Sequence, residues 1–218
     1  MSFKKNYFKS RNSLLRDGRR EYLAEREIKT ILLLLENFYD QPDIKNLNVL
    51  DVGAGDFFLK SIIEKYGARY TGIDIEDCDF ENEDFPLDDN IFDLIICYSV
   101  IEHLSDPSKM LENCRRTMKN KAFLIIETPN WRYCKLRFYD DYTHVKPYTD
   151  ISLKKLLEDS GFYQIELMPN VRCKSLFFYR FKYRFLLASL LPFKGQNKYF
   201  PFLSGRATGL IACSRSKS

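Results

Sequence analysis

Two glycines lie directly after a short apolar run that contains an acid. In the stretch NVLDVGAGDFFLK, Asp51 precedes Gly53 and Gly55, and the next apolar run, ARYTGIDI, carries a second acid, Asp74, near its end. Because glycine has no Cβ, it can adopt unusual backbone angles and lets a ligand approach the main chain closely. An acid at the end of the following strand is well placed to accept hydrogen bonds from a ribose diol. The pattern therefore predicts a ligand that contains a nucleoside.

The residues around the glycines narrow the kind of nucleoside compound. A dinucleotide-binding fingerprint would need a third glycine at the position of Phe58, where a bulky side chain would obstruct a pyrophosphate. The sequence also lacks the Gly-Lys-Ser or Gly-Lys-Thr of a P-loop. Asp51 instead suits a ligand with an amino group and a sulfonium, because opposite charges attract. S-adenosylmethionine carries both groups, so we expect it to be the cofactor.

Strand and helix patterns alternate along the chain and place these residues at strand ends. The expected strands cover residues 46–52, 68–75, 91–99, 121–129, 162–168 and 209–215, and the expected helices cover residues 21–40, 56–67, 106–120 and 150–162. Residues 131–149 lack a clean period, so we expect a long loop or a broken helix there. Strands that alternate with helices imply an α/β fold, with a mostly parallel sheet of six or seven strands and helices on both faces. Only about sixteen residues separate Ile75 from Ile91, so the third-strand region is expected to be abbreviated.

Four segments in this order resemble class I S-adenosylmethionine-dependent methyltransferases. The segments are VLDVGAGDF, TGIDI, DFPLDDNIFDLIICYSVIEHLSDP and LIIETPN, and the resemblance covers roughly residues 48 to 168. One glycine pair alone would be weak evidence, whereas four segments in the right order are specific. The resemblance implies an enzyme that transfers a methyl group, with the Rossmann-like fold of that class and an antiparallel last strand.

Carried over to this chain, the resemblance implies a set of cofactor contacts. They are Asp51, Gly53 and Gly55 with the methionine part, Asp74 and Ile75 with the ribose, Asp79 and the Phe80 backbone with the adenine, and Tyr98 against the cofactor. Because the third-strand region is short, Glu81 could take the place of Asp79. A solvated loop carboxylate is the alternative for each acid, and it competes most closely at Asp79.

The two histidines of the chain, His103 and His144, are the candidates for a general base. Methyl transfer is an in-line displacement, so a hydroxyl acceptor needs a group that takes its proton. His144 lies in DDYTHVKPYT, which resembles methyltransferases found among bacterial surface-glycan assembly enzymes. We expect His144 to be the base, oriented by Asp140 or Asp141. The alternatives are a His144 that only packs the loop and a His103 that acts as the base. The spacing fits no metal pattern, so no metal site is predicted.

Charge is distributed unevenly along the chain. Residues 1–20 sum to +6, residues 21–166 to −12 and residues 167–218 to +10, for a net charge of +4. Residues 174–202 interleave Phe and Tyr with Lys and Arg, which suits an interfacial segment on an anionic membrane, although a second small core or a dimer face explains the pattern equally well. ETPNW lacks the double-proline motif of nucleic-acid amino methylation, so no nucleic-acid partner is expected.

The cysteines indicate the cellular compartment of the protein. The six cysteines form no CxxC pair, and Cys97 and Cys213 lie in apolar runs, which suits small core residues in a reducing compartment. We expect a cytoplasmic protein, with peripheral contact at the inner face of the membrane if 174–202 is interfacial. The expected organisation is a basic and amphipathic helical extension over 1–40 and a methyltransferase domain over 41–218, with an aromatic and basic insertion over 169–205.

These observations favour a methyltransferase that acts on a hydroxyl of a sugar or glycolipid precursor, with a small molecule or a lipid-linked sugar as the acceptor. One alternative is a methyltransferase of another small molecule, such as a quinone or an amine. A second alternative, from a different class, is a noncatalytic scaffold that keeps the cofactor-binding fold. The sequence leaves the methylated atom and the oligomeric state open.

Overall fold

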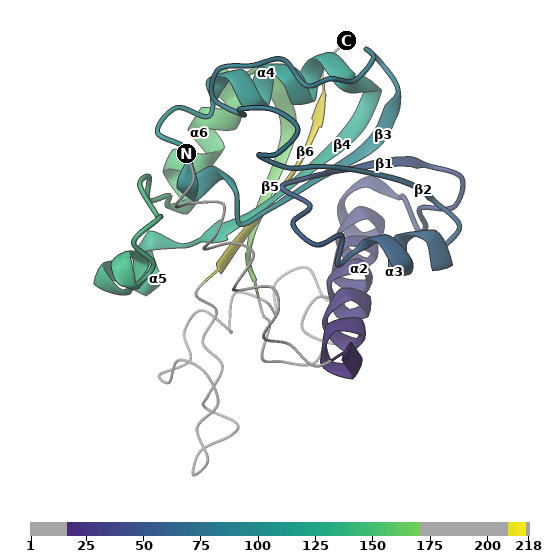
Figure 1. Cartoon of the computed structure of the whole chain (residues 1–218), viewed down its shortest axis with the longest axis horizontal. Coiled ribbons are helices and arrows are strands. Elements are labelled where there is room, and N and C mark those ends of the chain that lie inside the picture. Colours follow the sequence, from purple (N-terminus) through teal and green to yellow (C-terminus); the bar gives the residue numbers. More distant parts are fainter. Residues whose placement is uncertain (1–16, 171–208, 217–218) are drawn as a thin grey trace.

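Six strands form one sheet in the order β2-β1-β3-β4-β6-β5 (Figure 1). The computed structural model describes residues 17–170 and 209–216. The strands are β1 (Asn48–Val52), β2 (Arg69–Ile73), β3 (Phe92–Tyr98), β4 (Met118–Pro129), β5 (Phe162–Asn170) and β6 (Gly209–Ser216). β1 pairs in parallel with β2 and β3, β3 pairs in parallel with β4, and β6 runs antiparallel to both β4 and β5. The predicted mostly parallel, Rossmann-like sheet with an antiparallel last strand is confirmed.

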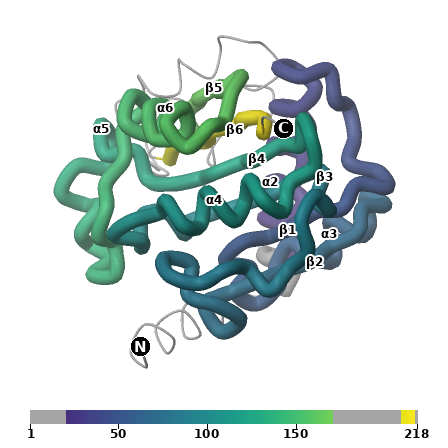
Figure 2. Tube along the Cα trace, turned by 90° about the horizontal axis from the view of Figure 1, so that it is seen from above, coloured from purple at the N-terminus to yellow at the C-terminus, as the bar shows by residue number. Residues whose placement is uncertain are grey.

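Helices cover both faces of this sheet, as predicted. α2 (Asp17–Tyr39) and α3 (Lys60–Lys65) lie on one side of the sheet, whereas α4 (Ser108–Thr117) and α6 (Asp150–Asp159) lie on the other (Figure 1). In the view from above, α4 runs along the sheet beside β4 (Figure 2). The buried apolar side chains form two clusters, one between the sheet and each helical layer. Because both faces are covered, the central strands read as continuous apolar runs.

The N-terminal helix α2 contributes an apolar stripe to one of these clusters. Ile28, Ile31 and Leu35 are fully buried and recur at the spacing of one helix face. They share a cluster with Leu94 of β3 and Ile125 of β4. The helix therefore packs on the same sheet that carries the strand ends described below. The proposed domain boundary at residue 40 stays a prediction.

Several element boundaries differ by a few residues from the sequence-based expectation, among them the starts of α3 and β4. The helix expected from residue 56 begins at Lys60, because Gly55 and Phe57 have φ values of +57° and cannot continue a right-handed helix. β4 begins at Met118, so the last residues assigned to a helix over 106–120 belong to a strand. The third-strand region, residues 74–91, contains neither helix nor strand, which confirms the predicted abbreviation.

Residues 131–149 form a broken helical segment, one of the two alternatives that the sequence left open, and we call them the α5–α6 segment. It contains α5 (Trp131–Cys134) and the 3₁₀ helix η2 (Lys135–Asp140), with Lys135 at φ +48° where the two meet. A second 3₁₀ turn, η1 (Ile101–His103), follows β3. The capping box of Thr149 and Ser152 then starts α6.

Cys97 and Cys213 are fully buried, as the sequence predicted. Within the described residues, no helix combines the length and the apolar character that are needed to cross a membrane. The aromatic and basic stretch over 174–202 lies outside the described residues.

Candidate active site

Asp51 provides a buried carboxylate in β1, near the carboxyl ends of the parallel strands. Asp51 is only 4% exposed, and the Tyr70 hydroxyl donates a hydrogen bond to Asp51 Oδ2 over 2.8 Å. Burial raises the pKa of Asp51 to about 7, the negative charge of Asp74 adds to this rise, and the Tyr70 hydrogen bond opposes it. A cationic ligand beside Asp51 would favour its charged form.

The turn after β1 can be formed only with glycine at position 53. Gly53 has φ +78°, and a Cβ built there would lie 2.2 Å from Val100 Cγ2. The Gly53 N–H donates to the Ile73 carbonyl over 2.8 Å, which draws the turn toward the end of β2. Val100 directly precedes η1. The glycine turn therefore packs against the start of the segment that carries Glu102 and His103.

Asp74 ties this turn to the next strand end. The Gly55 N–H donates to Asp74 Oδ2 over 2.7 Å, and the Ile75 N–H donates to Asp74 Oδ1 over 2.7 Å. A carboxylate can accept about four hydrogen bonds. Asp74 can therefore brace the loop through the main chain and still accept a bond from a ligand hydroxyl.

The residues that the resemblance implies as contacts of the cofactor's adenine lie in a loop whose acidic side chains accept hydrogen bonds from neighbouring residues. Asp79 accepts hydrogen bonds from the Glu81 N–H at 3.0 Å and from Asn82 Nδ2 at 3.1 Å. Glu81 Oε1 accepts from the Asp106 N–H over 2.9 Å, which links this loop to the start of α4. Phe80 is buried, and its ring lies 5.6 Å from that of Phe85. Tyr98, at the end of β3, is half-buried and pairs in register with Glu127 of β4.

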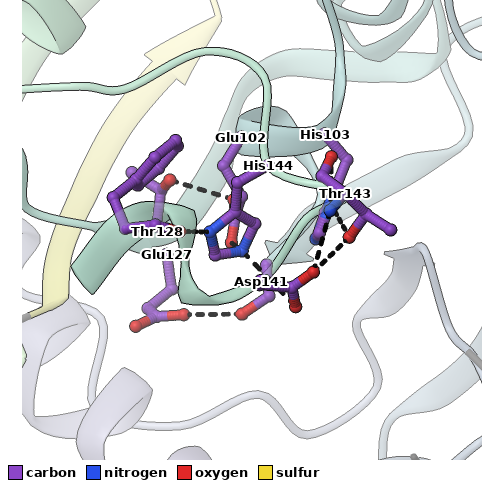
Figure 3. A network of polar contacts seen from close by, with 9 residues as sticks. Glu102, His103, Glu127, Thr128, Asp141, Thr143 and His144 are labelled. Atoms are coloured by element: carbon purple, nitrogen blue, oxygen red, sulfur yellow. Dashed lines mark hydrogen bonds and ion pairs between the residues drawn. The ribbon is translucent and has the colours of Figure 1, made fainter. Parts of the chain in front are cut away.

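A second group of polar residues gathers around His144 in the α5–α6 segment (Figure 3). His144 Nδ1 lies 2.6 Å from the Phe138 carbonyl oxygen. Because a carbonyl can only accept, Nδ1 carries the proton, and neutral His144 presents the lone pair of Nε2. Nε2 lies 3.9 Å from Asp141 Oδ2 and 4.0 Å from Glu102 Oε1. The structure therefore aims the proton-accepting nitrogen at two carboxylates.

His103 lies beside His144 and contacts the same loop. The two rings are 4.8 Å apart, and His103 Nδ1 lies 3.1 Å from the Thr143 carbonyl oxygen and 3.0 Å from Thr143 Oγ1. The Thr143 hydroxyl donates to Asp141 Oδ1 over 2.6 Å. Of the two acids proposed to orient His144, Asp141 belongs to this network, whereas Asp140 is exposed and pairs with Arg137 at 3.4 Å.

The sequence analysis did not identify Glu102, which the structure places at the centre of this group. Glu102 is only 1% exposed, and its Oε2 accepts a hydrogen bond from Thr128 Oγ1 over 2.9 Å. Its carbonyl oxygen accepts from the N–H groups of Val145 and Lys146. The only signal in the sequence is its position beside His103, in a stretch that the resemblance already covered.

Glu102, His103 and His144 could also hold a cation. One ligand atom from each residue lies within 4.8 Å of the others. The Nδ1 atom of each histidine is occupied by a carbonyl, which leaves Nε2 as the ligand atom, and second bonds of this kind orient metal-binding histidines. The prediction of no metal site therefore stays a prediction.

Glu127 is a further buried acid at the carboxyl edge that the sequence analysis did not identify. It lies near the end of β4, where its Oε1 accepts from Asn170 Nδ2 over 3.0 Å and its Oε2 accepts from Ser99 Oγ over 3.2 Å. A Cβ on Gly209 would lie 2.6 Å from Glu127 Oε1. Side chains from the end of β5 and from the residue after β3 thus meet Glu127. Glu127 itself lies beside the His144 group (Figure 3).

Known proteins match both the sequence and this fold. Residues 15–167 match the family described as a methyltransferase domain. A ubiquinone biosynthesis O-methyltransferase of Coxiella burnetii is 29% identical over an alignment of 115 positions, which covers 44% of this chain and 49% of that protein. The chain thus spans about half the length of the curated relatives it matches.

Solved structures share the fold at low sequence identity. An S-adenosylmethionine-dependent methyltransferase from Archaeoglobus fulgidus has a TM-score of 0.55 at 21% identity, covering 89% of this chain and 99% of that chain. A phosphoethanolamine N-methyltransferase of Haemonchus contortus, in complex with S-adenosyl-L-methionine, has a TM-score of 0.54 at 14% identity, covering 87% of this chain and 52% of that chain. Since the family match covers more than half of the sequence, the chain belongs to the methyltransferase domain family and carries, as predicted, the Rossmann-like fold of S-adenosylmethionine-dependent methyltransferases.

Proposed function

We propose that this protein transfers the methyl group of S-adenosylmethionine to a hydroxyl of its acceptor, with His144 as the general base. The orientation of His144 carries the proposal. Its Nδ1 proton is bound by the Phe138 carbonyl, so the lone pair of Nε2 faces the side on which Glu102 and Asp141 lie. A group that only packed the loop would not need both carboxylates at that nitrogen.

The cofactor would lie over the glycine turn. Asp51 would pair with the amino group of the methionine part, Gly53 and Gly55 would leave room for the chain of the ligand, and Asp74 with the Ile75 region would bind the ribose. Asp79, the Phe80 backbone and Tyr98 would complete the adenine and methyl ends. Support comes from the burial of Asp51 and from the hydrogen bond between Gly55 and Asp74, which holds the two strand ends together.

The reaction is an in-line displacement at the methyl carbon. The acceptor oxygen forms the new bond to carbon as the carbon–sulfur bond breaks, and the cofactor leaves as S-adenosylhomocysteine. His144 Nε2 takes the hydroxyl proton, which makes the oxygen a better nucleophile. The imidazolium that results lies near Glu102 and Asp141, whose carboxylates are placed to interact with the positive charge that develops on the ring.

Two similarities bear on the class of the acceptor. A sugar or glycolipid precursor, including a lipid-linked sugar, is suggested by the similarity of DDYTHVKPYT to glycan-assembly methyltransferases. The name of the Coxiella burnetii relative favours a second candidate, a phenolic hydroxyl of a quinone precursor. Both are hydroxyls, so both need a base. An amine acceptor and a noncatalytic scaffold are the remaining alternatives, and contact of 174–202 with an anionic membrane remains part of the proposal for a lipid-linked acceptor.

Two measurements test these assignments in sequence. Calorimetric titration with S-adenosylmethionine and with S-adenosylhomocysteine tests the cofactor, and no heat with either would favour a scaffold. Incubation with methyl-labelled cofactor and a nucleotide sugar, a soluble catechol or a primary amine, followed by mass spectrometry, then identifies the acceptor class.

The base is tested with the acceptor found in this way. His144→Ala should lower kcat about 10²- to 10⁴-fold, the usual contribution of general base catalysis, while leaving the affinity for S-adenosylmethionine unchanged. His103→Ala is the matched control, because the two rings are neighbours. A larger loss of kcat in His103→Ala than in His144→Ala would assign the base to His103 instead.

A further inference from the structure

The α5–α6 segment carries an apolar row on its outer side. Four of the large apolar side chains that the described residues expose belong to this one segment: Leu136, Tyr139, Tyr142 and Val145. Leu136 is 80% exposed and Tyr142 is 65% exposed. Side chains of this size cost free energy when they face water, and a contiguous set of them marks an interaction surface.

The spacing of this row is three residues throughout. A 3₁₀ helix has three residues per turn, so side chains at i and i+3 lie on the same side, and η2 (Lys135–Asp140) in this way places Leu136 and Tyr139 together. Tyr142 and Val145 continue the interval beyond the end of η2, and both are exposed. Phe138, Asp141 and His144 follow the same interval one step out of phase, and they are buried or nearly so. The segment therefore has two sides, an inner one that carries the proposed base and its carboxylate and an outer one that is apolar.

Cations accompany the apolar row. Within residues 131–149 the segment has four Lys or Arg and two Asp. Lys135 and Arg137 of η2 are exposed, as is Arg132 of α5. Of the two acids, Asp141 belongs to the inner side, where the Thr143 hydroxyl donates to it, whereas Asp140 is exposed and pairs with Arg137. Arg132 pairs with Asp150 at the start of α6. Exposed ion pairs contribute little free energy, so both arginines can exchange these partners for lipid phosphates. In Figure 2 the segment between α5 and α6 runs along the margin of the molecule, clear of the helix pair α2 and α3.

We propose that the outer side of the α5–α6 segment docks on an anionic lipid surface. Apolar side chains flanked by Lys and Arg match a headgroup boundary, which offers hydrocarbon beneath negative charge. Leu136, Tyr139, Tyr142 and Val145 enter this boundary, and Lys135 and Arg137 meet the lipid phosphates. The proposed base lies on the inner side of the same segment, so docking would bring the site close to the lipid surface, and a lipid-borne acceptor would pass around the segment to reach His144.

The tryptophan of this chain provides a local reporter. Trp131 is the single Trp of the sequence, and its ring lies 5.7 Å from that of Tyr139 and 5.9 Å from that of Phe138. Its fluorescence therefore responds to insertion of the apolar row. If the protein instead bound vesicles through another segment, such as residues 174–202, the apolar row would not enter the bilayer and Trp131 fluorescence would not shift.

The experiment uses the full chain and two kinds of vesicle, phosphatidylcholine alone and phosphatidylcholine with about 30% phosphatidylglycerol. The wild-type protein should float with the anionic vesicles and not with the neutral ones, with a blue shift of Trp131 emission, and high salt should weaken flotation. The double variant L136D/Y142D should lower the partition coefficient about tenfold or more and abolish the blue shift. Tyr22→Asp in α2 is the matched control, since Tyr22 is 62% exposed, and it should float like the wild type.

Each other outcome would overturn the proposal. Flotation of L136D/Y142D with an unchanged blue shift would remove the row as the contact. Flotation without any blue shift in the wild type would place the contact elsewhere. Failure of the wild type to float, together with a dimer that L136D/Y142D dissociates, would make the row a contact between copies. Thermal unfolding and calorimetry with S-adenosylmethionine check that the variants are folded. The proposal does not depend on turnover, and His144→Ala should float like the wild type.

Discussion

The two halves of the site differ in how far apart along the chain their bonded partners lie. On the cofactor side, the hydrogen bonds of Asp51 and Gly55 each join residues 19 positions apart. On the acceptor side, Glu102 is bonded to a residue 26 positions away, and His103 to one 40 positions away. The cofactor side is built by one strand–helix–strand unit, whereas the acceptor side exists only after the α5–α6 segment has folded over η1. Changes on the first side should therefore alter cofactor affinity, and changes on the second should alter turnover.

The largest effect on cofactor affinity is expected from Asp51→Asn. This change removes the buried negative charge that would pair with the amino group of S-adenosylmethionine and keeps the shape of the side chain. We expect the Kd for S-adenosylmethionine to rise about 100-fold near pH 8, the scale expected for loss of one partner of a buried charge pair. Calorimetric titration measures it, and an unchanged Kd would move the amino group away from Asp51. Asp93→Asn is a control at the opposite end of the sheet, where Asp93 pairs with Lys119.

The affinity for S-adenosylmethionine is expected to change about tenfold per pH unit below pH 7, because Asp51 must ionise to bind a cation. The folded pKa of about 7 lies above the ordinary value of 3.8, so the free protein loses stability as the pH rises from about 4 to 7. Affinity for S-adenosylmethionine should show the reverse trend, rising about tenfold per pH unit below 7 and levelling off above it. Titrations between pH 5.5 and 8 test this expectation.

Two variants, Tyr70→Phe and Asp51→Asn, test whether Asp51 is the group whose titration causes this pH dependence. The Tyr70 hydrogen bond lowers the pKa of Asp51, so its loss should move the plateau of affinity to higher pH. Asp51→Asn should give a flat profile. A profile that keeps its slope in Asp51→Asn would assign the titration to another group.

The same contrast explains how much of the site the sequence could predict. Gly53 and Gly55 were identifiable because the residue type and the spacing indicate their backbone role. The structure gives both of them positive φ values. Glu102 was not identifiable, because its approach to His144 depends on how a 3₁₀ turn after β3 meets a loop some forty residues later. The mostly parallel sheet and the two helical layers followed from the alternation of patterns. The start of α3 did not, because positive φ values in the turn delay the helix.

A smaller effect, on turnover alone, is expected from Thr143→Val. Thr143 is buried, and its hydroxyl bonds Asp141 and lies beside His103 Nδ1. Valine keeps the shape and removes these contacts, so Asp141 is held less firmly near His144. We expect kcat to fall about fivefold, roughly the loss of one hydrogen bond, with an unchanged Kd for S-adenosylmethionine. Thr143→Ser keeps the hydroxyl and should restore kcat, and a loss of cofactor affinity in Thr143→Val would indicate coupling between the halves.

The smallest effect on kcat is expected from removal of metal ions by chelation. This measurement separates two chemistries that the same three side chains allow, a general base and a metal site. Glu102, His103 and His144 could bind a divalent cation, but a His144 Nε2 that is bound to a metal cannot accept a proton. If His144 is the base, dialysis against EDTA should leave kcat unchanged. Loss of kcat that Mg²⁺, Mn²⁺ or Zn²⁺ restores would instead make the three residues ligands, and the cation would then polarise the acceptor oxygen. Glu102→Gln distinguishes the cases further. It keeps the side chain's shape and a carbonyl that can accept from Thr128, so a base mechanism should tolerate it better than a metal site that depends on the carboxylate.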